Sequence, residues 1–290
     1  MISRQKIAVL FAAIVILTAL IVVIAPLFKK QSRLAFQYEH IQLAGSGYLI
    51  DCTLLPAKKL LPSKESVLVV YLHGLSANCE QAFEIPSKYP FAFATREAFP
   101  NVTFFSCDYG TVGSWCNNYG YKDITCSIEE ISKRIPISKI IMVGTSMGGC
   151  TALAYATSAP QDIKDKIIGV LAIYAAGDLT RLYEETKSIE VRSALERAFN
   201  GTPQNTKELY LKDSFIPNLT KLSRGVKVYI ISALKDKVIP PRLQYELIEQ
   251  LKAADIPFKA NYLPCYHVAV PPTENFIEGL RFILSADHCR

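Results

Sequence analysis

Histidine is scarce in this chain, with 4 among 290 residues, so few side chains are available as a neutral-pH base. The 8 cysteines include no Cys-x-x-Cys pair, and neither a zinc site nor a dithiol redox motif is indicated. There is no internal repeat and no low-complexity tract, which excludes repeat architectures. No basic stripe is interleaved with aromatic residues, so nucleic-acid binding is not expected despite a net charge of +6.

Charge is absent from one long segment near the N-terminus. Residues 7–28 are 22 uncharged, mostly aliphatic residues, enough to cross a bilayer core of roughly 30 Å. A signal-peptide core is shorter, about 7–15 residues, and Pro26 to Lys30 offers no small-residue cleavage site. We predict an uncleaved signal-anchor, a transmembrane helix over residues 7–28, within an anchor region of residues 1–33. A cleaved signal peptide is the alternative.

The orientation of this anchor is not decided by its flanking charges. Arg4 and Lys6 precede the apolar segment, while Lys29, Lys30 and Arg33 follow it. An even number of cysteines behind a membrane-inserting segment favours an oxidising compartment, with disulfides of undetermined pairing. Buried free thiols are the alternative. We expect a single-pass protein whose main domain lies on the non-cytoplasmic side of the membrane, in a periplasmic or other extracytoplasmic space.

The remaining residues, 34–290, alternate between strand and helix patterns. This alternation predicts an α/β fold with a mostly parallel central sheet flanked by helices. One interval, about 176–224, is too long for an ordinary connection. We predict that it is a cap inserted over the carboxyl ends of the strands, and a surface excursion is the alternative. The expected elements are a hairpin over 34–55, strands over 67–72, 101–106, 139–143, 167–174, 226–232 and 258–263, and helices over 124–134, 147–158, 243–253 and 273–284.

The most specific motif is Gly-Thr-Ser-Met-Gly-Gly at residues 144–149, which follows an apolar strand pattern and precedes a helix pattern. Gly-x-Ser-x-Gly in this context is the sequence form of a nucleophile elbow, which exposes one serine hydroxyl above a buried strand. Gly144 and Gly148 flank the serine where side chains would collide with neighbouring backbone. Ser146 is the predicted nucleophile and is expected in a strained conformation. The alternative is a tight turn with a capping serine.

A serine nucleophile needs a base and a group that orients the base. His267 follows the last predicted strand, so it emerges at the same sheet edge as Ser146 and is the candidate base. Asp236 follows the preceding strand and is the candidate orienting acid, with Asp178 as its rival. The chain order is then Ser, Asp, His.

The oxyanion formed during acyl transfer needs N–H donors. One is expected from Met147, directly after the nucleophile at a helix N-terminus, and the other from Leu75 in the loop after the first core strand. Gly74 keeps this loop tight. His73 precedes it and is expected to be structural. This chemistry requires neither a cofactor nor a metal.

These motifs resemble those of α/β-hydrolase fold serine hydrolases over roughly residues 66–284. A narrower similarity, through residues 201–203 and 210–215, is to the catalytic domain of prolyl-oligopeptidase-like peptidases. Here, however, Asp213-Ser214-Phe215 replaces the usual Ser-Pro pair, and the chain has no room for a propeller. The resemblance implies hydrolysis of a carboxylic ester or thioester through an acyl-enzyme on Ser146, with a small-molecule or lipid-like acyl substrate. The alternatives are a serine peptidase acting on short peptides and a non-catalytic binding protein of the same fold.

Overall fold

The computed structural model describes residues 38–45, 47–59, 66–83, 90–110 and 113–285. The chain divides into two units, Met1–Gln37 and Tyr38–Arg290, and all elements below belong to the second. The anchor predicted at residues 7–28 lies outside the described residues and stays a prediction. Within the described ranges, no helix combines the length and the apolar character that crossing a membrane requires.

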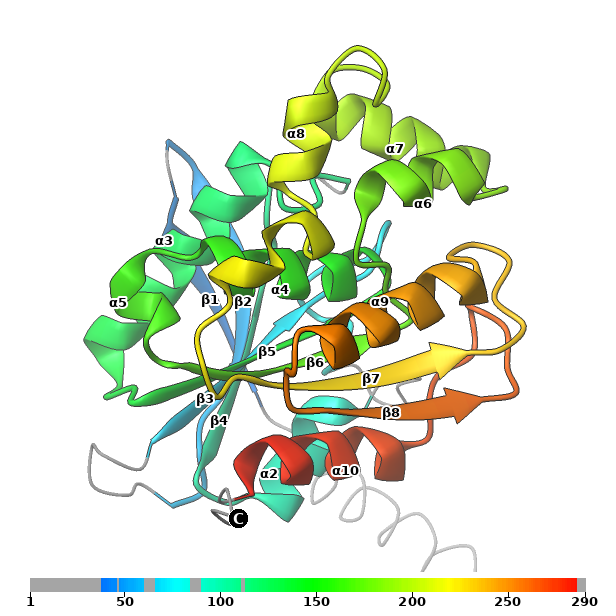
Figure 1. The fold of residues 1–290 in the computed structure, drawn as a ribbon. Coiled ribbons are helices and arrows are strands. Elements are labelled where there is room, and N and C mark those ends of the chain that lie inside the picture. The colour runs from blue at the N-terminus through cyan, green and yellow to red at the C-terminus, as the bar shows by residue number, and fades with distance from the viewer. Residues whose placement is uncertain (1–37, 46, 60–65, 84–89, 111–112, 286–290) are drawn as a thin grey trace, which may run out of the picture. The chain divides into compact units, whose positions relative to one another are not determined.

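A single sheet of eight strands, in the order β1-β2-β4-β3-β5-β6-β7-β8, organises the described residues (Figure 1). The first two strands form the predicted antiparallel hairpin, β2 is also antiparallel to β4, and the other neighbours are parallel. The predicted α/β fold with a mostly parallel sheet is therefore confirmed. The strands are β1 (Glu39–Ala44), β2 (Leu49–Leu55), β3 (Val67–Leu72), β4 (Val102–Cys107), β5 (Lys139–Thr145), β6 (Ile167–Ile173), β7 (Lys227–Ala233) and β8 (Phe258–Leu263).

Helices cover both faces of this sheet, which explains why the central strands read as continuous apolar runs. All residues of β3, β4 and β7 are buried. One face packs against α3, α4 and α9, and the other against α2 and α10 (Figure 1). The helices outside the predicted cap are α2 (Phe91–Ala98), α3 (Asn118–Arg134), α4 (Met147–Ser158), α5 (Gln161–Lys164), α9 (Pro241–Ala253) and α10 (Thr273–Leu284).

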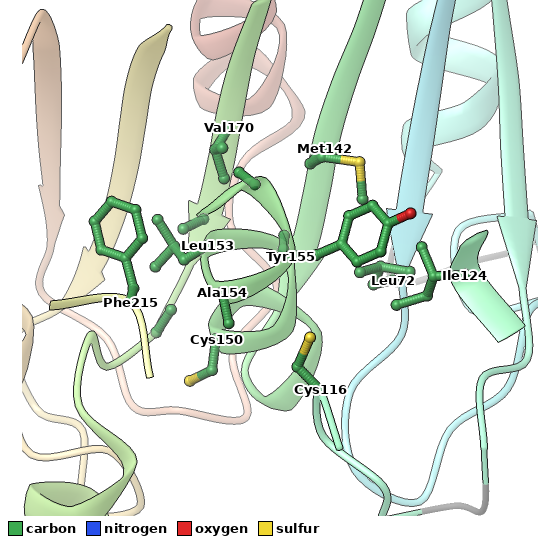
Figure 2. Close-up of a cluster of buried hydrophobic side chains, with 14 of the residues drawn as sticks. Leu72, Cys116, Ile124, Met142, Cys150, Leu153, Ala154, Tyr155, Val170 and Phe215 are labelled. Carbon is green, nitrogen blue, oxygen red and sulfur yellow. The ribbon is translucent and has the colours of Figure 1, made fainter. Parts of the chain in front are cut away.

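Helix α4 is buried on almost every side, and its packing holds the preceding residue, Ser146, in place. In Figure 2, Leu153 lies towards Phe215, whereas Tyr155 lies towards Met142 and Leu72 of the sheet. The Tyr155 hydroxyl is 2.9 Å from the hydroxyl of Thr125 on α3, so its polar end is also paired. Truncating such a buried side chain typically costs about 2–5 kcal/mol. The N-terminus of α4 is therefore a rigid platform at the end of β5.

The predicted cap interval is helical: it contains α6 (Leu179–Glu185), α7 (Ile189–Phe199), α8 (Lys207–Lys212) and the 3₁₀ helix η2 (Ile216–Lys221). Figure 1 shows α6, α7 and α8 as a layer beyond α4 and α9. The Ser76 hydroxyl donates to the carboxylate of Glu190 on α7 at 2.9 Å, and the Thr186 hydroxyl donates to the Val238 carbonyl at 2.7 Å. The interval therefore contacts the loops after β3 and β7, which contain predicted site residues.

Candidate active site

Ser146 connects β5 to α4 in a conformation that L-residues rarely adopt, with φ 58° and ψ −117°. Its N–H donates to the Ile173 carbonyl at 2.8 Å, and its carbonyl accepts the N–H of Cys150 at 3.0 Å. These bonds to β6 and to the first turn of α4 hold the strained residue in place. The structure thus has the strained serine that the motif predicts.

The glycines of the elbow are required by close backbone approaches. A Cβ atom at Gly148 would lie 2.0 Å from the Leu72 carbonyl oxygen, and one at Gly144 would lie 2.1 Å from the Gly148 carbonyl oxygen. Neither oxygen belongs to a flexible side chain that could move away. Glycine at both positions lets α4 start directly against the ends of β3 and β5, which brings Ser146 to the edge of the sheet.

His267 and Asp236 come together with Ser146 from three separate loops. His267 Nε2 is 2.8 Å from Ser146 Oγ, and His267 Nδ1 is 2.6 Å from Asp236 Oδ2. A proton on Nδ1 is donated to the carboxylate and leaves Nε2 to accept the serine proton. The side chain of His267 is 14% exposed and that of Asp236 is fully covered. The arrangement pairs a nucleophile with a base and the base with an orienting carboxylate.

Four donors surround the Asp236 carboxylate. Its Oδ1 accepts the N–H groups of Val238 and Ile239 at 2.8 and 2.9 Å. Its Oδ2 accepts His267 and, at 3.2 Å, the side-chain amide of Gln244. Hydrogen bonds of this kind fix the orientation of the carboxylate.

Gln244 is a site residue that the sequence analysis missed. Its side chain is buried on α9 and links the Asp236 carboxylate to the Ile239 carbonyl and the Ala233 N–H. The signal available in the sequence is one glutamine within the apolar face of this helix, between Leu243 and Leu247. A buried polar side chain has to be hydrogen-bonded, so such a glutamine indicates a nearby polar partner.

The rival acid Asp178 has another role. Its carboxylate accepts the N–H groups of Thr180 and Arg181 at 2.8 and 3.2 Å and caps the N-terminus of α6. The structure therefore places Asp236, and not Asp178, against His267.

The loop after β3 lies beside the serine. A Cβ atom at Gly74 would be 3.9 Å from the Cβ of Ser146, and the Gly74 N–H donates to the side chain of Gln81 at 2.9 Å. Among the described residues, neither the N–H of Leu75 nor that of Met147 has an acceptor. Both groups are thus available as the predicted oxyanion donors.

His73 stabilises this loop. It is buried, its Nδ1 lies 2.9 Å from the Gly74 carbonyl, and its ring lies 4.7 Å from that of Tyr109. Burial lowers the pKa of His73, because the cationic form would be desolvated. A neutral histidine here donates to the carbonyl and stabilises the turn. Within the described residues, no cluster of three or more His, Cys, Asp or Glu side chains is arranged to hold a metal ion.

The arrangement of strands and helices agrees with a comparison to known proteins. The family model of the alpha/beta hydrolase fold matches residues 67–168, from β3 into β6. The chain has the α/β-hydrolase fold. No curated protein matches it by sequence.

Solved structures of this fold are similar over most of the chain. An S-formylglutathione hydrolase from Staphylococcus aureus has 15% identity and a TM-score of 0.67, and the match covers 86% of this chain and 99% of that one. Pyrococcus horikoshii acylaminoacyl peptidase has 13% identity and a TM-score of 0.65, over 85% of this chain and 40% of the peptidase. A puromycin-hydrolyzing peptidase from Mycobacterium tuberculosis has 16% identity and a TM-score of 0.64, over 84% of this chain and 38% of that one. The chain thus spans about two fifths of either peptidase.

Proposed function

We propose that the protein is a serine hydrolase that cleaves carboxylic ester or thioester bonds through an acyl-enzyme on Ser146. The observation that carries the proposal is the hydrogen-bond chain from Ser146 Oγ through His267 to Asp236, which starts at a strained serine. A serine hydroxyl becomes an effective nucleophile when such a base accepts its proton.

The geometry supports acyl transfer in two halves. Ser146 Oγ attacks the substrate carbonyl carbon while its proton moves to Nε2 of His267, and Asp236 stabilises the resulting imidazolium. The N–H groups of Leu75 and Met147 bind the oxyanion, and the positive end of the α4 dipole adds to this effect. The tetrahedral intermediate then expels the alcohol or thiol, which receives the proton from His267. Water then attacks the acyl-enzyme in the same way, with His267 as the base, and the acid is released.

Ester or thioester cleavage is favoured over peptide cleavage by the extent of the similarity. The S-formylglutathione hydrolase matches over nearly its whole length, whereas the peptidases have long additional regions outside the match. A peptidase acting on short peptides is the second candidate, since the acylaminoacyl and puromycin-hydrolyzing peptidases have the same fold. Cleavage rates of p-nitrophenyl acyl esters and of aminoacyl amides, measured on the same preparation, separate the two candidates.

Replacing the nucleophile tests the chemistry directly. Ser146→Ala is expected to lower kcat/KM for a p-nitrophenyl ester by at least about 10⁴-fold and to abolish labelling by a fluorophosphonate probe. Ser158→Ala, at the exposed end of the same helix, is the matched control and should retain both. Full activity of Ser146→Ala would refute the assignment. Folded wild-type protein that neither turns over nor is labelled would favour a non-catalytic binding role.

We also propose that residues 7–28 tether the hydrolase to a membrane as a single span, with the hydrolase on the non-cytoplasmic side. The uncharged 22-residue run supports a span, and the eight cysteines support an oxidising side. A tethered enzyme of this kind would meet lipid-like acyl substrates. We expect the full chain to stay in the membrane fraction after alkaline washing. We also expect protease added outside intact cells or spheroplasts to cleave the hydrolase. Release by the alkaline wash would contradict the tether, and protection from protease would contradict the orientation.

A further inference from the structure

Three buried cysteines lie on the paired strands β2 and β4 and in the loop after β3, and none of them belongs to the proposed triad. Cys52 lies in β2, Cys107 is the last residue of β4, and Cys79 lies in the loop after β3. All three are free thiols in the structure. Each of the three thiols has a neighbour from this group close enough to raise its pKa, in addition to the larger effect of burial.

The pairing of β2 with β4 sets two of these residues directly opposite each other. Cys52 is the register partner of Cys107, and Asp51 is therefore opposite Asp108. The Asp108 N–H donates to the Asp51 carbonyl at 2.9 Å, so that pair is a hydrogen-bonded one. Because hydrogen-bonded and non-hydrogen-bonded pairs alternate in an antiparallel ladder, Cys52 and Cys107 form a non-hydrogen-bonded pair.

Residues in such a pair approach closely and present their side chains on the same face. The Cα atoms of non-hydrogen-bonded pairs are typically about 4.5 Å apart, within the range of about 4.4–6.8 Å seen for disulfides. Cys52 and Cys107 also belong to the same buried cluster, on the face of the sheet covered by α3. We propose that Cys52 and Cys107 are a disulfide site, which joins the β1–β2 hairpin covalently to β4.

Both thiols of the pair are buried, and a cavity lies near them. A cavity of about 520 Å³ is lined by Cys52 and Cys79, with His40, Asp51 and Glu80 among its other walls. Cys107 is completely buried. Cys52 is almost completely buried as well, so an incoming disulfide such as oxidised glutathione reaches the pair only when this part of the chain opens.

The reaction is two successive exchanges. The Cys52 thiolate attacks the oxidant, one glutathione thiol leaves, and a mixed disulfide forms on Cys52. The Cys107 thiol then loses its proton and attacks Cys52 Sγ, which expels the second glutathione thiol. Two electrons and two protons pass from the protein to the oxidant. Since burial disfavours both thiolates, we expect exchange to be fast during folding or local opening and slow in the folded state.

The bond has a measurable consequence because it closes a long stretch of chain. It would enclose residues 53–106, 54 in number, and would raise Tm by up to about 10 °C if the unfolded chain is restrained as simple loop-closure arguments predict. The bond would also fix Asp108, whose carboxylate accepts the Cys79 N–H at 2.7 Å and lies 3.7 Å from the ring of His73.

The test uses the purified full chain, equilibrated with oxidised and reduced glutathione, with and without urea below the unfolding transition. Free thiols are blocked, and unreduced tryptic peptides are analysed by mass spectrometry. The expected product links residues 34–58 to 97–122, with fragmentation assigning Cys107 and not Cys116. The oxidised wild type should have a higher Tm than the reduced form.

Variants separate this bond from other oxidations. Cys52→Ser and Cys107→Ser should lose both the linked peptide and the redox-dependent change in Tm, whereas Cys126→Ser, a half-buried thiol on α3, should keep both. If every thiol is blocked at all ratios of oxidised to reduced glutathione, even with urea present, no disulfide has formed and the proposal is wrong. A linkage of residues 34–58 to 65–88, which contains Cys79, would overturn the choice of partner. Neither result depends on hydrolase activity.

Discussion

Gln244 bonds to the same carboxylate oxygen of Asp236, the acid of the proposed triad, as His267 does. Its Nε2 lies 3.2 Å from Asp236 Oδ2, and its Oε1 accepts the Ala233 N–H at 3.1 Å. One side chain on α9 thus connects the end of β7 to the loop that carries Asp236. The carboxylate is positioned by a helix packed into the core rather than by its own loop alone.

Gln244→Ala is expected to reduce both stability and catalysis. The variant leaves a buried Ala233 N–H without a partner, at a cost of about 1–3 kcal/mol in the free energy of unfolding. Loss of one donor to Asp236 loosens the orientation of His267, and we expect kcat to fall by about 10-fold while KM changes little. Urea unfolding and ester kinetics measure the two effects. Gln250→Ala, on the exposed face of the same helix, is the control, and an unchanged kcat in Gln244→Ala would contradict the positioning role.

The elements with strong local signals were predictable from the sequence. The strand over 67–72 and the helices over 147–158 and 273–284 have the predicted bounds, because each is a clear apolar or amphipathic run with definite ends. Helix α3 begins six residues before the predicted start, since Asn117 caps it through bonds to the N–H groups of Tyr119 and Gly120. A glycine in the first turn hid that beginning. The short helix α2 was not predicted.

The proposed triad was also found from sequence, because each member follows a predicted strand. Gln244 could not be found in the same way. Its role depends on the rotation of α9 against β7, and that rotation is set by packing and not by any motif. The cysteine pairing was undetermined for the same reason, since the β2–β4 register joins residues far apart in the chain.

Alanine at two glycines should separate folding from catalysis. Gly148→Ala places a Cβ atom 2.0 Å from the Leu72 carbonyl, so we expect a loss of several kcal/mol of stability or no folded protein. Gly74→Ala meets only ordinary contacts, the nearest at 3.5 Å from the Thr145 carbonyl. We expect it to fold with a change below about 1 kcal/mol. Its methyl group lies beside Ser146, and kcat should fall by about 10-fold or more. Circular dichroism, thermal unfolding and ester kinetics distinguish the cases. A fully active Gly74→Ala would exclude this loop from the oxyanion site.

Removing the hydrogen bond between Ser76 and Glu190 tests whether the predicted cap shapes the substrate site. Both side chains are exposed, so Glu190→Ala should change the free energy of unfolding by less than about 0.5 kcal/mol. Because the bond ties α7 to the loop that contains Leu75, its loss should raise KM by about 2- to 5-fold and leave kcat nearly constant. Glu208→Ala, an exposed change on α8, is the control. An unchanged KM across short and long acyl chains would show that α7 does not contribute to binding.

The buried carboxyl group of Asp213, at the end of α8, should make the stability of the protein depend on pH. Desolvation raises the pKa of Asp213 to about 7, and Lys212 only partly opposes this effect. The unfolded chain releases the proton near pH 4, whereas the folded protein keeps it until about pH 7. The folded state therefore binds more protons between these values, and its stability falls as pH rises through that window and levels off above it.

Asp213→Asn removes this titration while keeping a similar shape. Wild type should lose about 2 kcal/mol more than the variant between pH 5 and pH 8. Urea unfolding at each pH gives the comparison, and Asp162→Asn, an exposed change, should behave like wild type. Parallel stability curves for wild type and Asp213→Asn would mean that this carboxyl group titrates as if it were in water.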